Sequence, residues 1–127
     1  MTIELIDTNI LTRFFIGDSP DQHRRTEQVF KEAEIGKRKL KLSALVVAEA
    51  TYVLESFYKR KRQEIAQFLK VFISQKWLAV EERKIMQSVW QWYLKGCHFV
   101  DSYLLASAKI NGEKILTFDK KLKKIAA

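Results

Sequence analysis

The chain has 127 residues, 47% of them hydrophobic, which is enough for about one domain with a single core. Its formal charge of +8 and pI of about 9.6 fit a polyanionic partner, although surface lysines that only confer solubility would give the same balance. The single cysteine, Cys97, excludes an internal disulfide and a thiolate metal cluster. Because the sequence has neither a signal-peptide pattern nor about 18 uninterrupted apolar residues, we expect a soluble, cytoplasmic protein.

Short apolar segments alternate with amphipathic ones along the chain. In chain order the expected elements are a strand (3–6), helices (8–16 and 20–35), a strand (39–43), helices (44–58 and 63–75), a strand (77–80), helices (82–95 and 99–111), a strand (114–117) and a short basic helix. Strands separated by helices cannot pair as hairpins, so they favour a parallel sheet covered by helices. The sequence therefore predicts an α/β fold in one domain, residues 1–127.

Two carboxylates stand at the ends of predicted strands. Asp7 ends "IELI", where Ile3, Leu5 and Ile6 predict a buried strand, and Asp119 follows "KILTF". Ligands of open parallel sheets bind just outside the carboxyl ends of the strands, so these two acids are candidates for a shared site. A simpler alternative stays open, because each aspartate can also cap the helix that follows it.

Two further carboxylates interrupt apolar helices. Glu49 lies in "ALVVAEATYVL", where helical spacing gives it the same face as Leu45 and Tyr52. Asp101 lies in "FVDSYLLASA" and shares a face with Leu104. Both are therefore expected to point toward the core. Asp101 is close enough to its helix start to be a capping residue, whereas Glu49 lies mid-helix.

Four carboxylates in one cleft would repel one another unless a cation were bound between them. All-oxygen ligands favour Mg²⁺ or Mn²⁺ over zinc. An acidic pocket on a basic protein suits a nucleic acid whose backbone is held by lysines while metal ions act on one phosphodiester. The basic runs at 37–41, 59–62 and 120–124 are more often solvated surface, but the last begins beside Asp119.

Other catalytic schemes have weaker support. Neither His23 nor His98 has a second histidine at ligand spacing, and no phosphate-binding loop, dinucleotide fingerprint or H-E-x-x-H motif is present. A signalling receiver domain would need an aspartate after a central strand and a lysine after the last one. Here "WLAVEE" offers only glutamates and "ILTFD" ends in an aspartate.

The motifs "LIDTNIL", "VVAEATYVL" and "DSYLLASAKINGEKILTFDKKL", in this order, resemble those of the PIN-domain ribonucleases, and the small size resembles their VapC toxin branch. The resemblance runs from about Ile3 to Ile125. It implies a three-layer α/β/α fold with a central parallel sheet of four to five short strands.

The resemblance also implies a Mg²⁺- or Mn²⁺-dependent endoribonuclease that leaves 5′-phosphate and 3′-hydroxyl ends. The residues that fit the four acids of the family, as metal ligands and catalytic groups, are Asp7, Glu49, Asp101 and Asp119. Thr8, Asn9 and Thr117 fit its polar positions beside the first and last acids.

RNA as substrate, a small antitoxin and a homodimer are the partners that the resemblance implies. The chain departs from the family pattern at Leu122, where a bulkier apolar residue is frequent, and in having no further acid after Asp119, which leaves one or two metal ions open. Two other functions stay open. They are a PIN nuclease of RNA processing without a toxin role, and a PIN-like module that binds RNA or protein without cutting.

Overall fold

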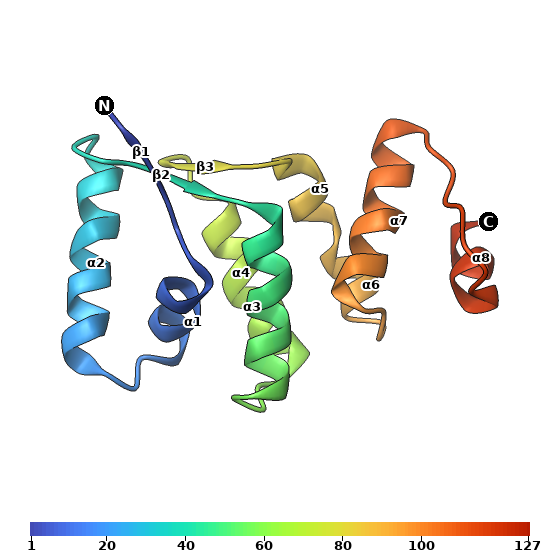
Figure 1. Cartoon of the computed structure of the whole chain (residues 1–127), viewed down its shortest axis with the longest axis horizontal. Coiled ribbons are helices and arrows are strands. Elements are labelled where there is room, and N and C mark those ends of the chain that lie inside the picture. The colour runs from blue at the N-terminus through green and yellow to red at the C-terminus, as the bar shows by residue number, and fades with distance from the viewer. The chain divides into compact units, whose positions relative to one another are not determined.

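The computed structural model describes residues 1–127 and contains two compact units, Met1–Glu81 (unit 1) and Glu82–Ala127 (unit 2). Unit 1 holds all the strands and four helices, and unit 2 holds four helices (Figure 1). A single domain over the whole chain stays a prediction. No helix is long and apolar enough to cross a membrane.

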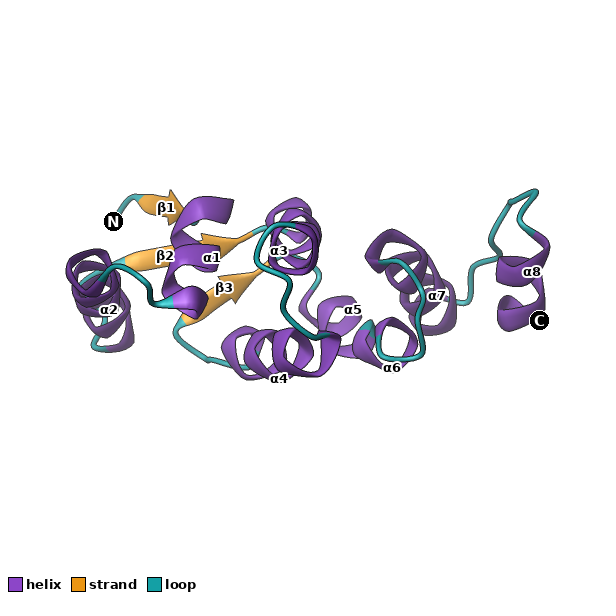
Figure 2. Cartoon of the chain, turned by 90° about the horizontal axis from the view of Figure 1, so that it is seen from below, coloured by secondary structure: helices purple, strands orange, loops and turns teal.

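Unit 1 is built on a parallel sheet of three strands in the order β1-β2-β3. Its elements are β1 (Ile3–Leu5), α1 (Thr8–Ile16), α2 (Pro20–Glu34), β2 (Lys39–Leu42), α3 (Ala44–Ser56), α4 (Arg62–Ile73) and β3 (Leu78–Val80). The strands run side by side with α1 to α4 packed around them (Figure 2). The predicted α/β class, with a parallel sheet flanked by helices, is confirmed.

Three of the four helices of unit 1 begin where the sequence places side chains that can accept hydrogen bonds from free backbone N–H groups, whereas α4 follows Lys61 and has no side-chain capping bond. Asp7, Ser19 and Ser43 cap α1, α2 and α3, and Pro20 occupies the first turn of α2. Helix α1 ends at Gly17, whose φ of 67° is unfavourable for residues with a Cβ atom. These local signals explain why the predicted helix starts agree closely with the structure.

One face of the sheet is buried and the other is exposed. Leu40 and Leu78 are neighbours in the register and are only 3% and 1% exposed. Ile3 and Leu5 pair with Lys39 and Lys41 on the opposite face, where they are 48% and 73% exposed. Successive side chains of a strand point to opposite faces, so Ile3 and Leu5 lie on the face opposite to that of Leu40.

The prediction that β1 is a buried strand is therefore wrong for Ile3 and Leu5. It holds for Ile6, which is 5% exposed and immediately precedes Asp7. The apolar run at the start of the chain is visible in the sequence. The pairing of β1 with β2, which decides the face on which each residue lies, is not.

The core of unit 1 combines aliphatic side chains with a cluster of aromatic rings. Phe30 lies 4.8 Å from Phe14, 5.3 Å from Phe72 and 5.6 Å from Trp77 between ring centroids. Leu54, on the inner face of α3, is fully buried. Phe72 also belongs to this core, since it is only 6% exposed.

Unit 2 consists of α5 (Arg83–Ser88), α6 (Trp90–Tyr93), α7 (Phe99–Asn111) and α8 (Lys120–Ala126). The single helix predicted at 82–95 is thus two short helices. Trp90 and Tyr93 are buried, and their rings meet edge to face at 5.5 Å. Trp90 is therefore a core residue of unit 2.

The strand predicted at 114–117 does not form. A strand exists only where its backbone pairs with another strand, and unit 2 contains none. The segment has no regular secondary structure, and Leu116 and Phe118 are almost completely exposed. The sheet therefore has three strands rather than the four to five that the resemblance implied.

Candidate active site

Asp7 lies where β1 ends and α1 begins. Its Oδ1 atom accepts a hydrogen bond of 2.8 Å from the backbone N–H of Ile10, which makes it the N-cap of α1. The capping role considered from the sequence is thus confirmed. The side chain is exposed, and its second oxygen accepts no hydrogen bond from the protein. Capping leaves that oxygen available for a ligand.

Glu49 is linked to the same corner of unit 1 through Thr8. The Thr8 hydroxyl donates a hydrogen bond to Oε1 of Glu49, joining the first turn of α1 to the middle of α3. Because Thr8 directly follows Asp7, this bond holds a second carboxylate close to the end of β1. The structure therefore brings the predicted residues Asp7, Thr8 and Glu49 together.

The expectation that Glu49 points toward the core is wrong. Leu45 and Tyr52, which share its face of α3, are 82% and 68% exposed. The buried face of α3 instead carries Val47 and Leu54. Helix α3 is apolar nearly all round, so helical spacing alone did not identify its inner face.

Asp101 lies in the first turn of α7 in unit 2. It is half-buried, and its carboxylate accepts no hydrogen bond from the protein. The N-cap of α7 is His98, which forms no side-chain capping bond. Capping therefore does not explain Asp101. A negative charge in the first turn of a helix is nevertheless favourable, because free N–H groups point toward it.

Asp119 caps α8 in unit 2. Its Oδ1 accepts a hydrogen bond of 3.0 Å from the N–H of Leu122, and its own N–H donates to the Thr117 hydroxyl at 3.0 Å. Asp119 is exposed and, like Asp7, has one carboxylate oxygen without a protein partner. Thr117, predicted as a polar position of the site, thus orients the backbone of the acid two residues later.

The structure places the four predicted acids as two pairs, one in each unit. Asp7 and Glu49 belong to unit 1, and Asp101 and Asp119 to unit 2. Neither unit gathers three or more His, Cys, Asp or Glu side chains closely enough to hold a metal ion. The donors are all carboxylates, and each of the four has at least one oxygen without a hydrogen-bond partner. This donor chemistry fits a hard divalent cation such as Mg²⁺ or Mn²⁺.

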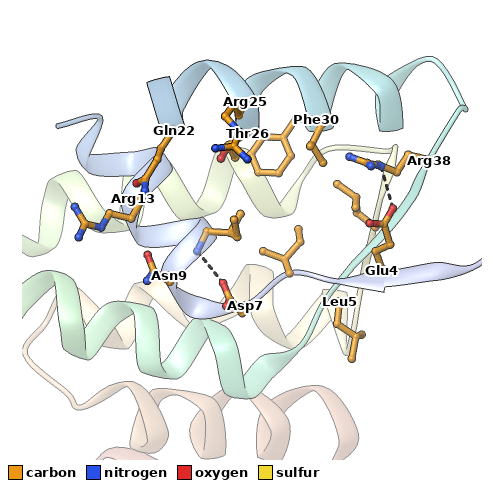
Figure 3. A pocket seen from close by; sticks show the side chains of 14 residues that line it. Glu4, Leu5, Asp7, Asn9, Arg13, Gln22, Arg25, Thr26, Phe30 and Arg38 are labelled. Atoms are coloured by element: carbon orange, nitrogen blue, oxygen red, sulfur yellow. Dashed lines mark hydrogen bonds and ion pairs between the residues drawn. The ribbon is translucent and has the colours of Figure 1, made fainter. Parts of the chain in front are cut away.

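A groove of about 540 Å³ opens beside Asp7 and belongs entirely to unit 1. Figure 3 shows Gln22, Arg25, Thr26 and Phe30 of α2 on one wall, with Asp7 and Asn9 on the other. The volume is within the range of about 300–1,000 Å³ that is usual for ligand pockets.

This groove was not predicted from the sequence, because its three arginines come from segments that are distant in the chain. Arg13 lies in α1, Arg25 follows Arg24 in α2, and Arg38 belongs to the basic run at 37–41. The available signal was the spacing of Gln22, Arg25 and Thr26, which places their side chains on one face of a helix.

A comparison with known families agrees with these observations, which are the order of the acidic motifs, the parallel sheet and the carboxylates near the end of β1. The sequence profile of the PIN domain matches residues 5–127. The chain belongs to the PIN domain family. The resemblance inferred from "LIDTNIL" and the later motifs is therefore confirmed.

This PIN domain is also similar to a protein named VapC ribonuclease from Aquifex aeolicus (strain VF5). The two are 27% identical over 125 residues, which cover 97% of this chain and 92% of that protein. No solved structure matches the chain significantly.

Proposed function

We propose that this PIN domain is an endoribonuclease that requires Mg²⁺ or Mn²⁺ and acts in the cytoplasm as the toxin of a toxin–antitoxin pair. The observation that carries the proposal is the hydrogen bond from Thr8 to Glu49, which keeps a second carboxylate beside Asp7 at the end of β1. Family membership and the name of the Aquifex relative support the same activity.

In this proposal Asp7, Glu49, Asp101 and Asp119 hold the cation and the attacking water. When bound, a Mg²⁺ or Mn²⁺ ion would supply an activated water and stabilise charge on the attacked phosphate. Asp7 and Asp119 each use one oxygen for helix capping and can present the other to the ligand. The lysines of α8, next to Asp119, can hold the RNA backbone electrostatically.

Cleavage of a mixed pool of single-stranded RNA by the purified full chain tests the proposal. We expect fragments in Mg²⁺ or Mn²⁺ and none in EDTA, and loss of activity by about two orders of magnitude in Asp101→Asn. Asp21→Asn is the matched control, because Asp21 is exposed and pairs only with Arg24. Intact RNA with both metals, or equal cleavage by Asp101→Asn and Asp21→Asn, would contradict the proposal.

The toxin role makes a separate prediction in cells. Induced expression of the chain should arrest growth, and co-expression of a short protein encoded immediately upstream should relieve the arrest. Arrest by Asp101→Asn as strong as by the wild type would show that toxicity does not come from cleavage. Normal growth under wild-type expression would favour an RNA-processing role.

A homodimer is also part of the proposal. Leu45, Tyr52 and Phe57, along α3 and just beyond its C-terminal end, are largely exposed apolar side chains that a second copy can cover. Light scattering coupled to gel filtration should give twice the chain mass of 14.9 kDa. A mass of one chain at all concentrations would contradict it.

A further inference from the structure

The groove beside Asp7 has a distinctive distribution of charge. Arg38 is compensated by two acids, since it lies 2.9 Å from Glu4 and 3.4 Å from Glu32. Arg13 pairs with Asp18 at 3.2 Å. Arg25 is exposed on the groove and forms no ion pair. The groove therefore has one uncompensated positive charge, on the α2 wall.

Arg13 can add a second positive charge when a ligand is present. The side chains of Arg13 and Asp18 are 43% and 48% exposed, and ion pairs between such exposed groups contribute little to stability. A phosphate entering the groove can thus compete with Asp18 at little cost.

A second observation points to a polar ligand. Thr26 lines the groove, is only 8% exposed, and its hydroxyl makes no hydrogen bond within the protein. By contrast, the hydroxyls of Thr12 and Thr51, which are also buried, donate to the helix carbonyls of Thr8 and Ala48. The only buried side-chain polar atom without a partner is Nε1 of Trp90, so the unpaired Thr26 oxygen is accessible from the groove and available to a ligand there.

We propose that this groove binds the nucleotide next to the cleaved phosphodiester in single-stranded RNA. Arg25 holds a phosphate of that nucleotide, and the Thr26 hydroxyl forms a hydrogen bond with its sugar or base. The buried side chains of Phe30 and Leu40 provide an apolar floor against which a base can pack. This inference rests on the proposed function, because Asp7 lines the groove itself.

An acidic peptide is the main alternative occupant, and two features favour RNA. The groove is continuous with Asp7, so an RNA strand held at Asp7 must have a neighbouring nucleotide close to it. The lining also offers the side-chain amides of Asn9 and Gln22, which can pair with base edges.

Fluorescence anisotropy with a fluorescein-labelled, mixed-sequence single-stranded RNA tests the inference on the full chain in EDTA, where no cleavage is expected. Arg25→Ala should raise the Kd by about tenfold, the loss expected for one charged hydrogen bond. In Mg²⁺ the same variant should raise KM and leave kcat unchanged, because the contact is the same before and during cleavage.

Arg24→Ala is the matched control. Arg24 is the preceding residue on α2, carries the same charge, pairs with Asp21 and lies outside the groove. It should change the Kd by less than about twofold, as is usual for an exposed surface charge. Thr26→Val, which keeps the shape of the side chain, should weaken RNA binding, and Thr26→Ser should restore it.

Equal RNA affinities for Arg25→Ala and Arg24→Ala would overturn the inference. The inference would also be overturned if Arg25→Ala bound RNA as tightly as the wild type but bound the antitoxin more weakly. That result would identify the groove as a protein-docking surface. If the wild type cleaves RNA and Asp101→Asn does not, either of these two results would refute RNA binding in the groove and leave the proposed nuclease function standing. A wild type that neither binds nor cleaves RNA would remove the proposed function as well.

Discussion

Asp7 serves the fold and the proposed chemistry with different atoms of one carboxylate. One oxygen accepts the N–H of Ile10, and the other is free. Asparagine keeps a capping oxygen but loses the negative charge, whereas alanine loses both. The two roles can therefore be separated by substitution.

We expect Asp7→Asn to abolish RNA cleavage with little change in the free energy of unfolding. Asp7→Ala should abolish cleavage and also destabilise the protein by about 1 kcal/mol, the usual cost of losing an N-cap. Urea unfolding followed by circular dichroism measures the stability, and the RNA assay measures the activity. Wild-type cleavage by Asp7→Asn would show that Asp7 only caps α1.

Thr8 is a positioning residue for Glu49. Replacing it by valine keeps the shape of the side chain and removes the hydroxyl that donates a hydrogen bond to Glu49. Losing an outer-shell partner of a metal ligand weakens metal affinity by about 10–100-fold. We expect that loss in Thr8→Val and recovery in Thr8→Ser, measured as Mn²⁺ binding by electron paramagnetic resonance. Equal affinities in all three proteins would contradict the role given to Thr8.

For individual residues, the sequence predicted the helix caps and the acids at strand ends better than it predicted which side chains are buried. Asp7 and Asp119 were recognised as both strand-end acids and possible caps, and both caps are present. The direction of Glu49 was predicted wrongly, because α3 is apolar on several faces. Arg25 and Thr26 were not recognised, since a groove depends on how two helices pack and not on the residues of either one.

Helices α1, α2 and α3 were the most predictable elements because their first turns are capped by side chains that immediately precede them in the sequence. Ser43 shows this for α3, the helix that carries Glu49, as its hydroxyl accepts from the N–H of Val46 at 3.3 Å. The prediction of a strand at 114–117 was wrong for the opposite reason. A strand needs a partner distant in sequence, and its own residues do not identify one.

We expect Ser43→Ala to lower the free energy of unfolding by about 1 kcal/mol, because the first turn of α3 loses its cap. Ser43→Asp should retain the stability, since aspartate caps as well as serine. Chemical denaturation of the three proteins measures the effect. Identical midpoints for wild type and Ser43→Ala would show that α3 is held by packing alone.

Over the whole molecule, the charge of +8 should make RNA binding depend strongly on salt. For single strands the slope of log affinity against log salt is about −0.7 per phosphate contact, so three contacts predict about a twentyfold loss between about 50 and 200 mM salt. Anisotropy titrations at several salt concentrations measure the slope. An affinity independent of salt would exclude the lysines and arginines as the source of binding.

The connection between the two groove walls has a consequence for the diversification of RNA specificity. Helices α1 and α2 are separated only by Gly17, Asp18 and Ser19, and Gly17 adopts a left-handed conformation with its N–H bonded to Arg13. A change in the length of this connection would shift Arg25 relative to Asp7 while every groove residue stayed the same.

We therefore expect a single glycine inserted after Gly17 to change the bases preferred around the cut, as read by sequencing the cleavage products. An unchanged preference would show that the connection does not set specificity. Related proteins with identical groove residues can then differ in the RNA they select, through a loop that touches no nucleotide.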